Sequence, residues 1–179
     1  MSPMKRRSAL RSMVVLSVLS SVVALAAWTK AGEGQASFKA TGPAGFKIVG
    51  VSKAVEVKDD GKVLTVTVKL ADIDTDNSLR NHHMLEDLEA TKFPECTLSV
   101  PLDVLKEGVT DTEGKGTFAI HGKTKDIPFK YTSKCTAGVC DVEGTADLNL
   151  KDYEVKIRSY LGITVKSEVS VAAKFQVKK

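Results

Sequence analysis

The residues best suited to chemistry in this sequence are three histidines that lie near acidic side chains. His82 precedes Glu86 by four residues and His83 precedes Asp87 by four. Side chains at this spacing share one face of a helix, and imidazole and carboxylate groups both bind metal ions. His121, beside a glycine, could supply a third nitrogen. The same spacing is typical of ordinary helix-surface ion pairs, so metal-dependent chemistry is an alternative here and no metal ligand is assigned.

Motifs for covalent or nucleotide chemistry are missing from the sequence. It has no Gly-x-Ser-x-Gly nucleophile motif, no phosphate-binding P-loop, no dinucleotide-binding glycine pattern and no His-Glu-x-x-His zinc motif. Acidic residues alternate with apolar ones along the predicted strands, where they face solvent, so no carboxyl pair is set in an apolar environment. We therefore predict no catalytic residue, no cofactor and no enzymatic activity.

Two of the three cysteines are spaced for a disulfide across a short turn. Cys135 and Cys140 enclose Thr-Ala-Gly-Val, a four-residue spacer that suits a hairpin loop. In an oxidising compartment we expect them to pair. Cys96 shares the predicted strand face of Leu98 and Val100, so we expect it to be buried and inert.

Hydrophobic residues alternate with polar ones through most of the chain after residue 35. Period-two alternation is the pattern of a strand with one apolar and one polar face, and clusters of Gly, Pro and Asp mark turns between such runs. The pattern predicts about eight strands, over residues 38–41, 46–57, 64–70, 96–100, 116–121, 127–132, 140–150 and 165–177.

One segment departs from this alternation. Asp76 or Asn77 can cap a helix, and Phe93-Pro94 ends it. Between them, leucine and methionine side chains recur at helical spacing. We therefore predict a short helix in this segment and a second helical turn near residues 152–155.

Antiparallel strands with one apolar face each must bury those faces, either between two packed sheets or inside one sheet curled into a barrel. Eight closed strands leave an interior that can hold one small ligand. Because the inward side chains are mostly those of Val, Leu, Ile and Ala, with few large aromatic ones, we predict an all-β, extended eight-stranded antiparallel barrel with a ligand cavity. The predicted wall consists of Phe46, Ile48, Leu64, Val66, Val68, Leu98, Val100, Phe118, Ile120, Phe129, Tyr131, Val142, Leu148, Val169, Val171 and Phe175.

The N-terminal segment is typical of an export signal. Four basic residues within the first eleven precede an apolar run over residues 13–27, shorter than the roughly 20 residues of a membrane-spanning helix. We predict a cleaved signal peptide over residues 1–27, a short linker over 28–35 and one domain over 36–179. The product is expected to be periplasmic or secreted, with no stable membrane insertion after cleavage.

Net charge argues against two classes of partner. The chain has 26 Lys and Arg against 22 Asp and Glu, and the four basic residues of the predicted signal account for the whole excess. A remaining domain of near-zero formal charge without a basic cluster has no electrostatic footprint for nucleic acid or for an anionic membrane.

Three motifs resemble those of the YceI-like proteins. Ser-Leu-Arg-Asn-His-His-Met over residues 78–84, followed by Lys-Phe-Pro over 92–94, resembles that family's Arg-Asp-x-His-Leu and Tyr-Pro signature. Residues 116–125 are similar to its Gly-x-Leu-x-Ile-His-Gly-x-Thr-Lys strand and turn, and residues 149–153 to a late Arg-x-Asp-Phe segment. The signature positions are Arg80, His83, Phe93, Pro94, His121, Gly122 and Thr124.

The resemblance covers roughly residues 36–178 and implies a lipocalin-like barrel that encloses a polyisoprenoid or similar long apolar lipid, with no established catalysis. It leaves two roles open for Arg80 and His83, barrel-end scaffold or ligand contact. The family's Trp-x-x-Asp start is missing here, and the cysteine pair is not a general family feature. The leading interpretation is an exported lipid-binding protein for transport, storage or sequestration. The alternatives are a metal-dependent or stress-related enzyme using His82, His83 and His121, or a structural barrel that binds a protein partner.

Overall fold

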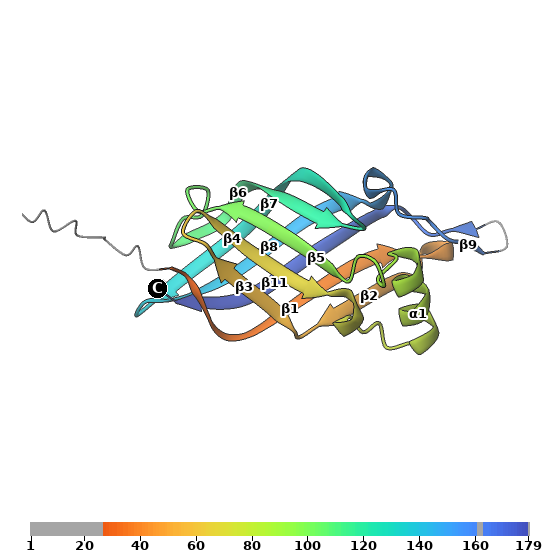
Figure 1. Cartoon of the computed structure of the whole chain (residues 1–179), viewed down its shortest axis with the longest axis horizontal. Helices are drawn as coiled ribbons and strands as arrows, with labels where there is room; N and C mark the ends of the chain where they lie inside the picture. Colours follow the sequence, from red (N-terminus) through yellow and green to blue (C-terminus); the bar gives the residue numbers. More distant parts are fainter. Residues whose placement is uncertain (1–26, 161–162, 179) are drawn as a thin grey trace, which may run out of the picture.

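The computed structural model describes residues 27–160 and 163–178 (Figure 1). The predicted signal peptide over residues 1–27 lies outside the described residues except for its last position. None of the helices in the described part is long and apolar enough to cross a membrane.

One antiparallel sheet of nine strands forms almost the whole molecule and curls into a nearly closed barrel (Figure 1). Neighbouring strands follow the order β2-β1-β11-β8-β7-β6-β5-β4-β3. The strands are β1 (Thr29–Thr41), β2 (Lys47–Ser52), β3 (Val55–Asp59), β4 (Val63–Lys69), β5 (Glu95–Pro101), β6 (Val109–Ile120), β7 (Lys123–Thr136), β8 (Val139–Asn149) and β11 (Glu168–Lys178).

Smaller elements gather at one end of the barrel. Helix α1 (Ser78–Asp87) and the two-stranded hairpin of β9 (Ser159–Tyr160) and β10 (Ile163–Thr164) lie at the right-hand end of Figure 1. Three short 3₁₀ helices, η1 (Pro43–Gly45), η2 (Leu70–Asp72) and η3 (Leu150–Tyr153), connect longer elements. The predicted helix corresponds to α1, but α1 ends at Asp87 and a turn segment leads on to Phe93-Pro94, where the helix was expected to end. The predicted second helical turn corresponds to η3, which begins two residues earlier than expected.

The predicted barrel is confirmed, but its strand count was wrong. The run over residues 46–57 was expected to be one strand, and it forms both β2 and β3. Strand β2 pairs with β1, whereas β3 pairs with β4. The break falls at Lys53 and Ala54, where the Ser52 hydroxyl accepts a hydrogen bond from the Ala54 backbone N–H at 3.1 Å. The buried positions change from Gly50 and Ser52 in β2 to Val55 and Val57 in β3, so the alternation shifts by one residue at the break, and the prediction drew one strand across this shift.

The beginning of β1 also differs from expectation. Residues 29–35 were predicted to belong to a linker, but they form the first half of β1 and pair with the end of β11, beginning with Thr29 opposite Lys178. Few large apolar residues occur in this stretch, so its sequence resembles a linker. The strand is fixed by pairing with β11, where Thr29 lies opposite Lys178, a residue 149 positions away in the sequence.

A seam lies between β1 and β3, the place where the sheet would need to join to become fully closed. Strand β3 is one edge of the sheet order and is not hydrogen-bonded to β1 along a ladder. The two strands nevertheless approach closely, because a Cβ at Gly34 would lie only 2.9 Å from Cβ of Val55. The absence of a side chain at Gly34 therefore allows side-chain packing to complete the wall.

Helix α1 begins and is held in place by local polar contacts. The Asn77 side chain caps it by accepting a hydrogen bond from the Arg80 backbone N–H at 2.9 Å. The segment before the helix is anchored to the barrel because Val51 and Asp74 exchange backbone hydrogen bonds of 2.8 and 2.9 Å. These contacts fix the helix against the barrel end.

The predicted disulfide is present between Cys135 and Cys140. It joins β7 to β8 across the turn at Ala137 and Gly138, both of which have positive φ. Because the enclosed loop is short, the bond removes little entropy from the unfolded chain.

We expect the Cys135→Ser/Cys140→Ser double variant to fold with a free energy of unfolding lower by about 2 kcal/mol, because a loop of this length gives only that much chain-entropy stabilisation. Denaturant titration of the oxidised wild type and the double variant measures the difference. A Cys96→Ser variant is the control for loss of a thiol, and a loss above about 4 kcal/mol in the double variant would contradict the entropy argument.

Candidate functional site

A cavity of about 790 Å³ runs through the barrel interior. This volume lies in the upper part of the range of about 300–1,000 Å³ found for ligand pockets. All the long strands except β3 contribute lining residues, and α1 and the segment at residues 155–159 complete the lining at one end. The barrel centre is thus hollow and mostly apolar.

Small residues at inward positions explain why the interior is not filled. The alternation of β8 and β11 directs Gly144, Ala146 and Ala173 inward, and Ala36 of β1 lies beside them. The facing strands β4 and β5 carry medium-sized aliphatic side chains such as Leu64. Because packing in a protein core normally leaves few voids larger than a water molecule, this arrangement reserves space for a guest.

Fifteen of the sixteen predicted wall residues line this cavity. Their contact with a ligand stays a prediction. The exception is Phe46, whose prediction was wrong: it does not line the cavity and its side chain is 57% exposed. It precedes β2, where the strand alternation does not yet apply, and its ring lies under the guanidinium of Arg80, with 5.6 Å between Cζ and the ring centroid.

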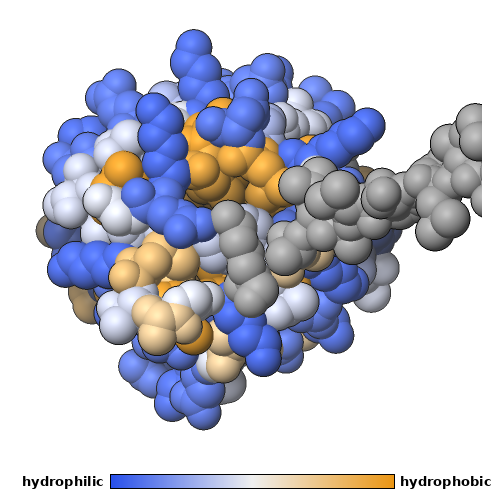
Figure 2. All heavy atoms as spheres, turned by 90° about the vertical axis from the view of Figure 1, so that its left-hand side faces the viewer, coloured by the Kyte–Doolittle hydropathy of each residue, from blue (hydrophilic) through white to orange (hydrophobic). Residues whose placement is uncertain are grey.

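A loop and an aromatic pair lie at the end opposite α1. The buried Tyr131 hydroxyl donates to the Val104 carbonyl and accepts from the Lys106 backbone N–H, both at 2.9 Å. Phe129 packs beside Tyr131 with ring centroids 5.7 Å apart. Figure 2 shows this end with hydrophilic residues around an apolar area. These contacts hold the 102–108 loop against the end of the cavity.

Polar groups of the lining concentrate at the α1 end. We call this end the mouth and define it by Arg80, His83, Asp87, Lys156 and Arg158, all of which line the cavity. The first three come from α1, and the last two follow η3. The cavity therefore has an apolar body and a polar, charged mouth.

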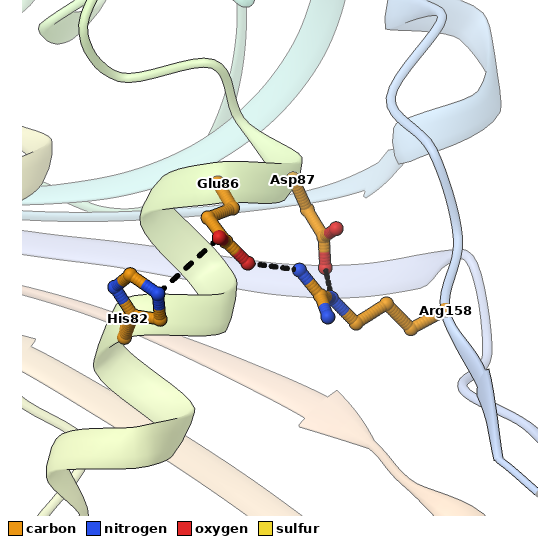
Figure 3. Close-up of polar contacts among 4 residues, drawn as sticks. All are labelled: His82, Glu86, Asp87 and Arg158. Atoms are coloured by element: carbon orange, nitrogen blue, oxygen red, sulfur yellow. Dashed lines mark hydrogen bonds and ion pairs between the residues drawn. The ribbon is translucent and has the colours of Figure 1, made fainter.

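Arg158 links the two sides of the mouth (Figure 3). Its Nε donates to Asp87 Oδ2 and its second terminal nitrogen to Glu86 Oε2, both at 2.6 Å. His82 Nε2 lies 3.2 Å from the other Glu86 oxygen. These hydrogen bonds raise the pKa of Arg158, with Asp87 contributing most. The Arg158 hydrogen bond, followed by the charge of His82, lowers the pKa of Glu86.

Arg80 is held by the segment that precedes its helix. Its Nε donates to the Thr75 hydroxyl at 3.0 Å, and a terminal nitrogen donates to the Thr75 carbonyl at 2.7 Å. Thr75 is 3% exposed and also bonds Asn81. Arg80 therefore has a clear structural role, while its position in the lining also places it where a ligand would end. Its contact with a ligand stays a prediction.

The other signature residues form a scaffold beside the cavity. His121 and Gly122, with φ of 54° and 68°, make the two-residue turn between β6 and β7. His121 Nδ1 lies 2.9 Å from the Tyr153 carbonyl oxygen, and its ring contacts Phe93 edge-on at 5.6 Å. A Cβ at Gly122 would lie 2.5 Å from the Phe93 ring, so both backbone conformation and space require glycine.

Two further signature residues, Pro94 and Thr124, are exposed. The Pro94 carbonyl accepts a hydrogen bond from the Leu70 backbone N–H at 2.8 Å, and Thr124 pairs with Ala119 in the β6–β7 ladder. Neither residue lines the cavity.

The structure does not bring the three histidines together. His82 interacts with Glu86, His83 lines the mouth, and His121 lies in the turn against Tyr153. Among the described residues, the one cluster of three potential ligand groups consists of Glu107 with Cys135 and Cys140, whose sulfur atoms form the disulfide. The metal hypothesis therefore gains no support from the geometry.

Cys96 is the one cysteine outside the disulfide, and it lines the cavity. Desolvation raises the pKa of its thiol to about 11. A thiol that is protonated at neutral pH is a weak nucleophile, which agrees with the prediction of an inert side chain. Its partial exposure is to the cavity, next to Leu98 and Val68.

Comparison with known proteins decides the family. The family model for the YceI-like domain matches residues 25–177. This chain belongs to the YceI-like family. Sequence comparison with curated proteins gives no significant match. The resemblance predicted from the three motifs is therefore confirmed over nearly the whole domain.

Solved structures of YceI-like and related proteins share the fold at low sequence identity. A polyisoprenoid binding domain from Saccharophagus degradans has a TM-score of 0.68 at 14% identity, covering 85% of this chain and 98% of that chain. BcnA of Burkholderia cenocepacia has a TM-score of 0.64 at 16% identity, covering 82% and 96%. A mutant YceI protein of Campylobacter jejuni has a TM-score of 0.53 at 16% identity, covering 98% and 99%.

Sequence reasoning missed part of this YceI-like site. Lys156 and Arg158 of the mouth lie in a segment without strand or helix periodicity, so no pattern marks them as lining residues. Ala36, Gly144 and Ala173 were not named as wall residues because the prediction chose large apolar side chains. Their inward position was nevertheless readable from the alternation of the strands.

We predict that Arg158→Ala loosens the mouth, because both ion pairs between α1 and the segment after η3 are lost. Amide hydrogen exchange in α1 should become roughly twofold to fivefold faster, in keeping with exposed ion pairs. Lys174→Ala, which removes the exposed pair between Lys174 and Glu143 on the barrel wall, is the control and should leave α1 unchanged.

The same link should depend on pH in the wild type. The folded pKa of Glu86 is lowered from its ordinary 4.5, so its contribution is fully present above pH 4.5 and is lost as the pH falls through the lower folded value. The protection of α1 amides, taken relative to the intrinsic exchange rate at each pH, should therefore fall in acid in the wild type and fall less in Arg158→Ala. An equal acid response in both proteins would contradict this assignment.

We also predict that Cys96 reports on the cavity. Its alkylation by N-ethylmaleimide should speed up about tenfold per pH unit toward a pKa of about 11, because the thiolate is the reacting form. A bound apolar ligand should slow the reaction by blocking access. Mass spectrometry follows the labelling, and Cys96→Ser is the control that should remain unlabelled under non-reducing conditions. If a saturating apolar ligand does not change the rate of Cys96 alkylation, the ligand does not bind in the cavity beside Cys96.

Proposed function

We propose that this YceI-like protein is an exported binding protein that encloses a polyisoprenoid or similar long apolar lipid for transport, storage or sequestration. The observation that carries the proposal is the apolar cavity of about 790 Å³ along the barrel. A family relationship to binding proteins and a fold shared with a polyisoprenoid binding domain support the same class of ligand.

The physical basis of binding is removal of a hydrocarbon chain from water. Burial contributes about 0.8 kcal/mol per CH₂ group, so ten buried carbons supply about 8 kcal/mol before the costs of association. The body of the cavity needs no charged contact for this. The polar mouth can accommodate a ligand end that stays hydrated, so an amphipathic lipid fits better than a pure hydrocarbon.

Export is part of the proposal. The N-terminal pattern of basic residues followed by an apolar run supports a periplasmic or secreted location. The disulfide between Cys135 and Cys140 supports an oxidising compartment, since such bonds are rare in reducing ones.

The proposal is tested by a substitution that fills the cavity with a larger side chain, so that a lipid no longer fits. Ala146→Phe places a large ring at an inward position of β8 where a small residue reserves space, whereas Glu143→Phe places the same ring on the exposed face of the same strand. Each protein is purified without detergent, and organic extracts are analysed by mass spectrometry. Circular dichroism confirms that both variants fold.

We expect the wild type and Glu143→Phe to carry a long-chain lipid in near-stoichiometric amount and Ala146→Phe to carry at least about tenfold less, because the ring occupies the space that the chain would fill. A wild type that is reproducibly free of lipid, and that binds none when it is added, would reject the lipid-binding role.

A further inference from the structure

The large apolar side chains that are most exposed in the described residues lie at the mouth end of the barrel. Phe46 is 57% exposed, Val49 44% and Leu79 62%. Phe46 lies between η1 and β2, and Leu79 is in the first turn of α1. Arg80 connects these elements through its contact with the Phe46 ring. Scattered exposed apolar residues are common, but here three lie at the same end of the barrel as the mouth.

Val49 belongs to the same end because of its place in the edge strand. Its neighbours Ile48 and Gly50 line the cavity, so Val49 faces outward. Two residues further on, Val51 is hydrogen-bonded to Asp74, just before α1. The outer face of β2 therefore continues the apolar surface that begins at Phe46.

Basic side chains flank this surface. Lys47 follows Phe46 in the sequence, and Lys39 of β1 is the direct cross-strand neighbour of Val49, with both lysines exposed. Lys156, at the mouth, is also exposed. The acidic side chains of α1 are already engaged, since Glu86 and Asp87 bind Arg158. Asp72, Asp74 and Asp76 also lie exposed at this end, and Asp74 is next to Val51, so the positive charge is local to Lys39 and Lys47 and does not extend over the whole end.

We propose that the rim surface, defined by Lys39, Phe46, Lys47, Val49 and Leu79, docks the mouth onto a lipid bilayer that contains anionic lipids. Aromatic and aliphatic side chains beside lysines match the interfacial region of such a bilayer, where apolar groups enter the boundary layer and cations meet anionic headgroups. This inference rests on the proposed function, because it describes how a lipid passes between membrane and cavity without crossing water.

The position of the rim surface relative to the cavity favours a bilayer over another partner. The mouth and the rim surface lie at the same end of the barrel, while the 102–108 loop, held by Tyr131, lies at the other end. A bilayer contact at the mouth would thus place the polar end of the cavity against the source of its guest. A contact at the other end would not.

Flotation with lipid vesicles tests the proposal with the whole mature chain. One set of vesicles contains phosphatidylcholine alone, and the other contains equal parts of phosphatidylcholine and phosphatidylglycerol. Phe46→Ser/Val49→Ser removes two exposed apolar side chains that do not line the cavity. Lys39→Gln/Lys47→Gln removes two charges. The control, Val63→Ser/Val139→Ser, removes two half-exposed valines at the opposite end of the barrel.

We expect Phe46→Ser/Val49→Ser to weaken partitioning into both kinds of vesicle by at least about tenfold, since partial burial of the two side chains is worth that much. The lysine variant should weaken binding only to vesicles with phosphatidylglycerol, by about tenfold or more. This difference from the wild type should become smaller at high salt, because salt screens the attraction between lysines and anionic lipids. The control should bind as the wild type does. Circular dichroism of each variant confirms folding, and the single variant Val49→Ser serves if the double variant does not fold.

Bound lipid, measured by mass spectrometry in every variant, separates this proposal from the previous one. Vesicle binding that depends on Phe46 and Val49 in a protein that never holds lipid would support docking and reject lipid binding. Lipid retained in the wild type together with vesicle binding unaffected by Phe46→Ser/Val49→Ser would overturn docking alone. Sedimentation that shows a dimer broken by the same variant, with vesicle binding unchanged, would assign the surface to a second copy of the chain and also overturn the proposal.

Discussion

An apolar interior that its own side chains do not fill is the constraint on which this structure depends. Curling one sheet brings the apolar faces of the strands together, and in most cores large side chains then occupy the space between them. Here Gly144, Ala146 and Ala173 occupy inward positions and leave a hollow instead. Atoms around an empty apolar space lack dispersion partners, so a guest that fills it stabilises the folded state by mass action.

The two ends of the barrel are held together by different kinds of contact. At one end, Tyr131 holds a loop in place through two hydrogen bonds and the disulfide joins neighbouring strands, so the wall is reinforced there. At the other end, α1 is joined to the facing segment by the ion pairs of Arg158 and by apolar packing of Met84 and Leu85 against the cluster that contains Val155. The ion pairs are largely exposed and contribute little to stability, so the apolar packing contributes most of the attachment.

The sequence predicted the parts of the fold that depend on local periodicity. Alternation identified the inward face of Leu64, Val66 and Val68 and of most other wall residues, and the capping residue Asn77 marked the start of α1. It did not predict the break after Ser52, because one strand was drawn across the shift in buried positions between Ser52 and Val55. It also did not predict the pairing of residues 29–35, because their partners in β11 are distant in sequence. Arg158 was missed for the same reason: its ion pairs join residues more than 70 positions apart. Phe46 was misplaced because alternation was extended beyond the strand that produces it.

The seam between β1 and β3 bears on how this architecture can vary. Elsewhere around the wall, backbone hydrogen bonds set the spacing between adjacent strands, and a change of girth would require a new register or an added strand. At the seam the spacing is set by side chains, with Gly34 facing Val55 across it. A substitution at either position would alter the circumference while every ladder stays intact. Homologous barrels can therefore differ in inner diameter through single substitutions along the seam between β1 and β3. The inner diameter in turn limits the thickness of the molecule that fits inside.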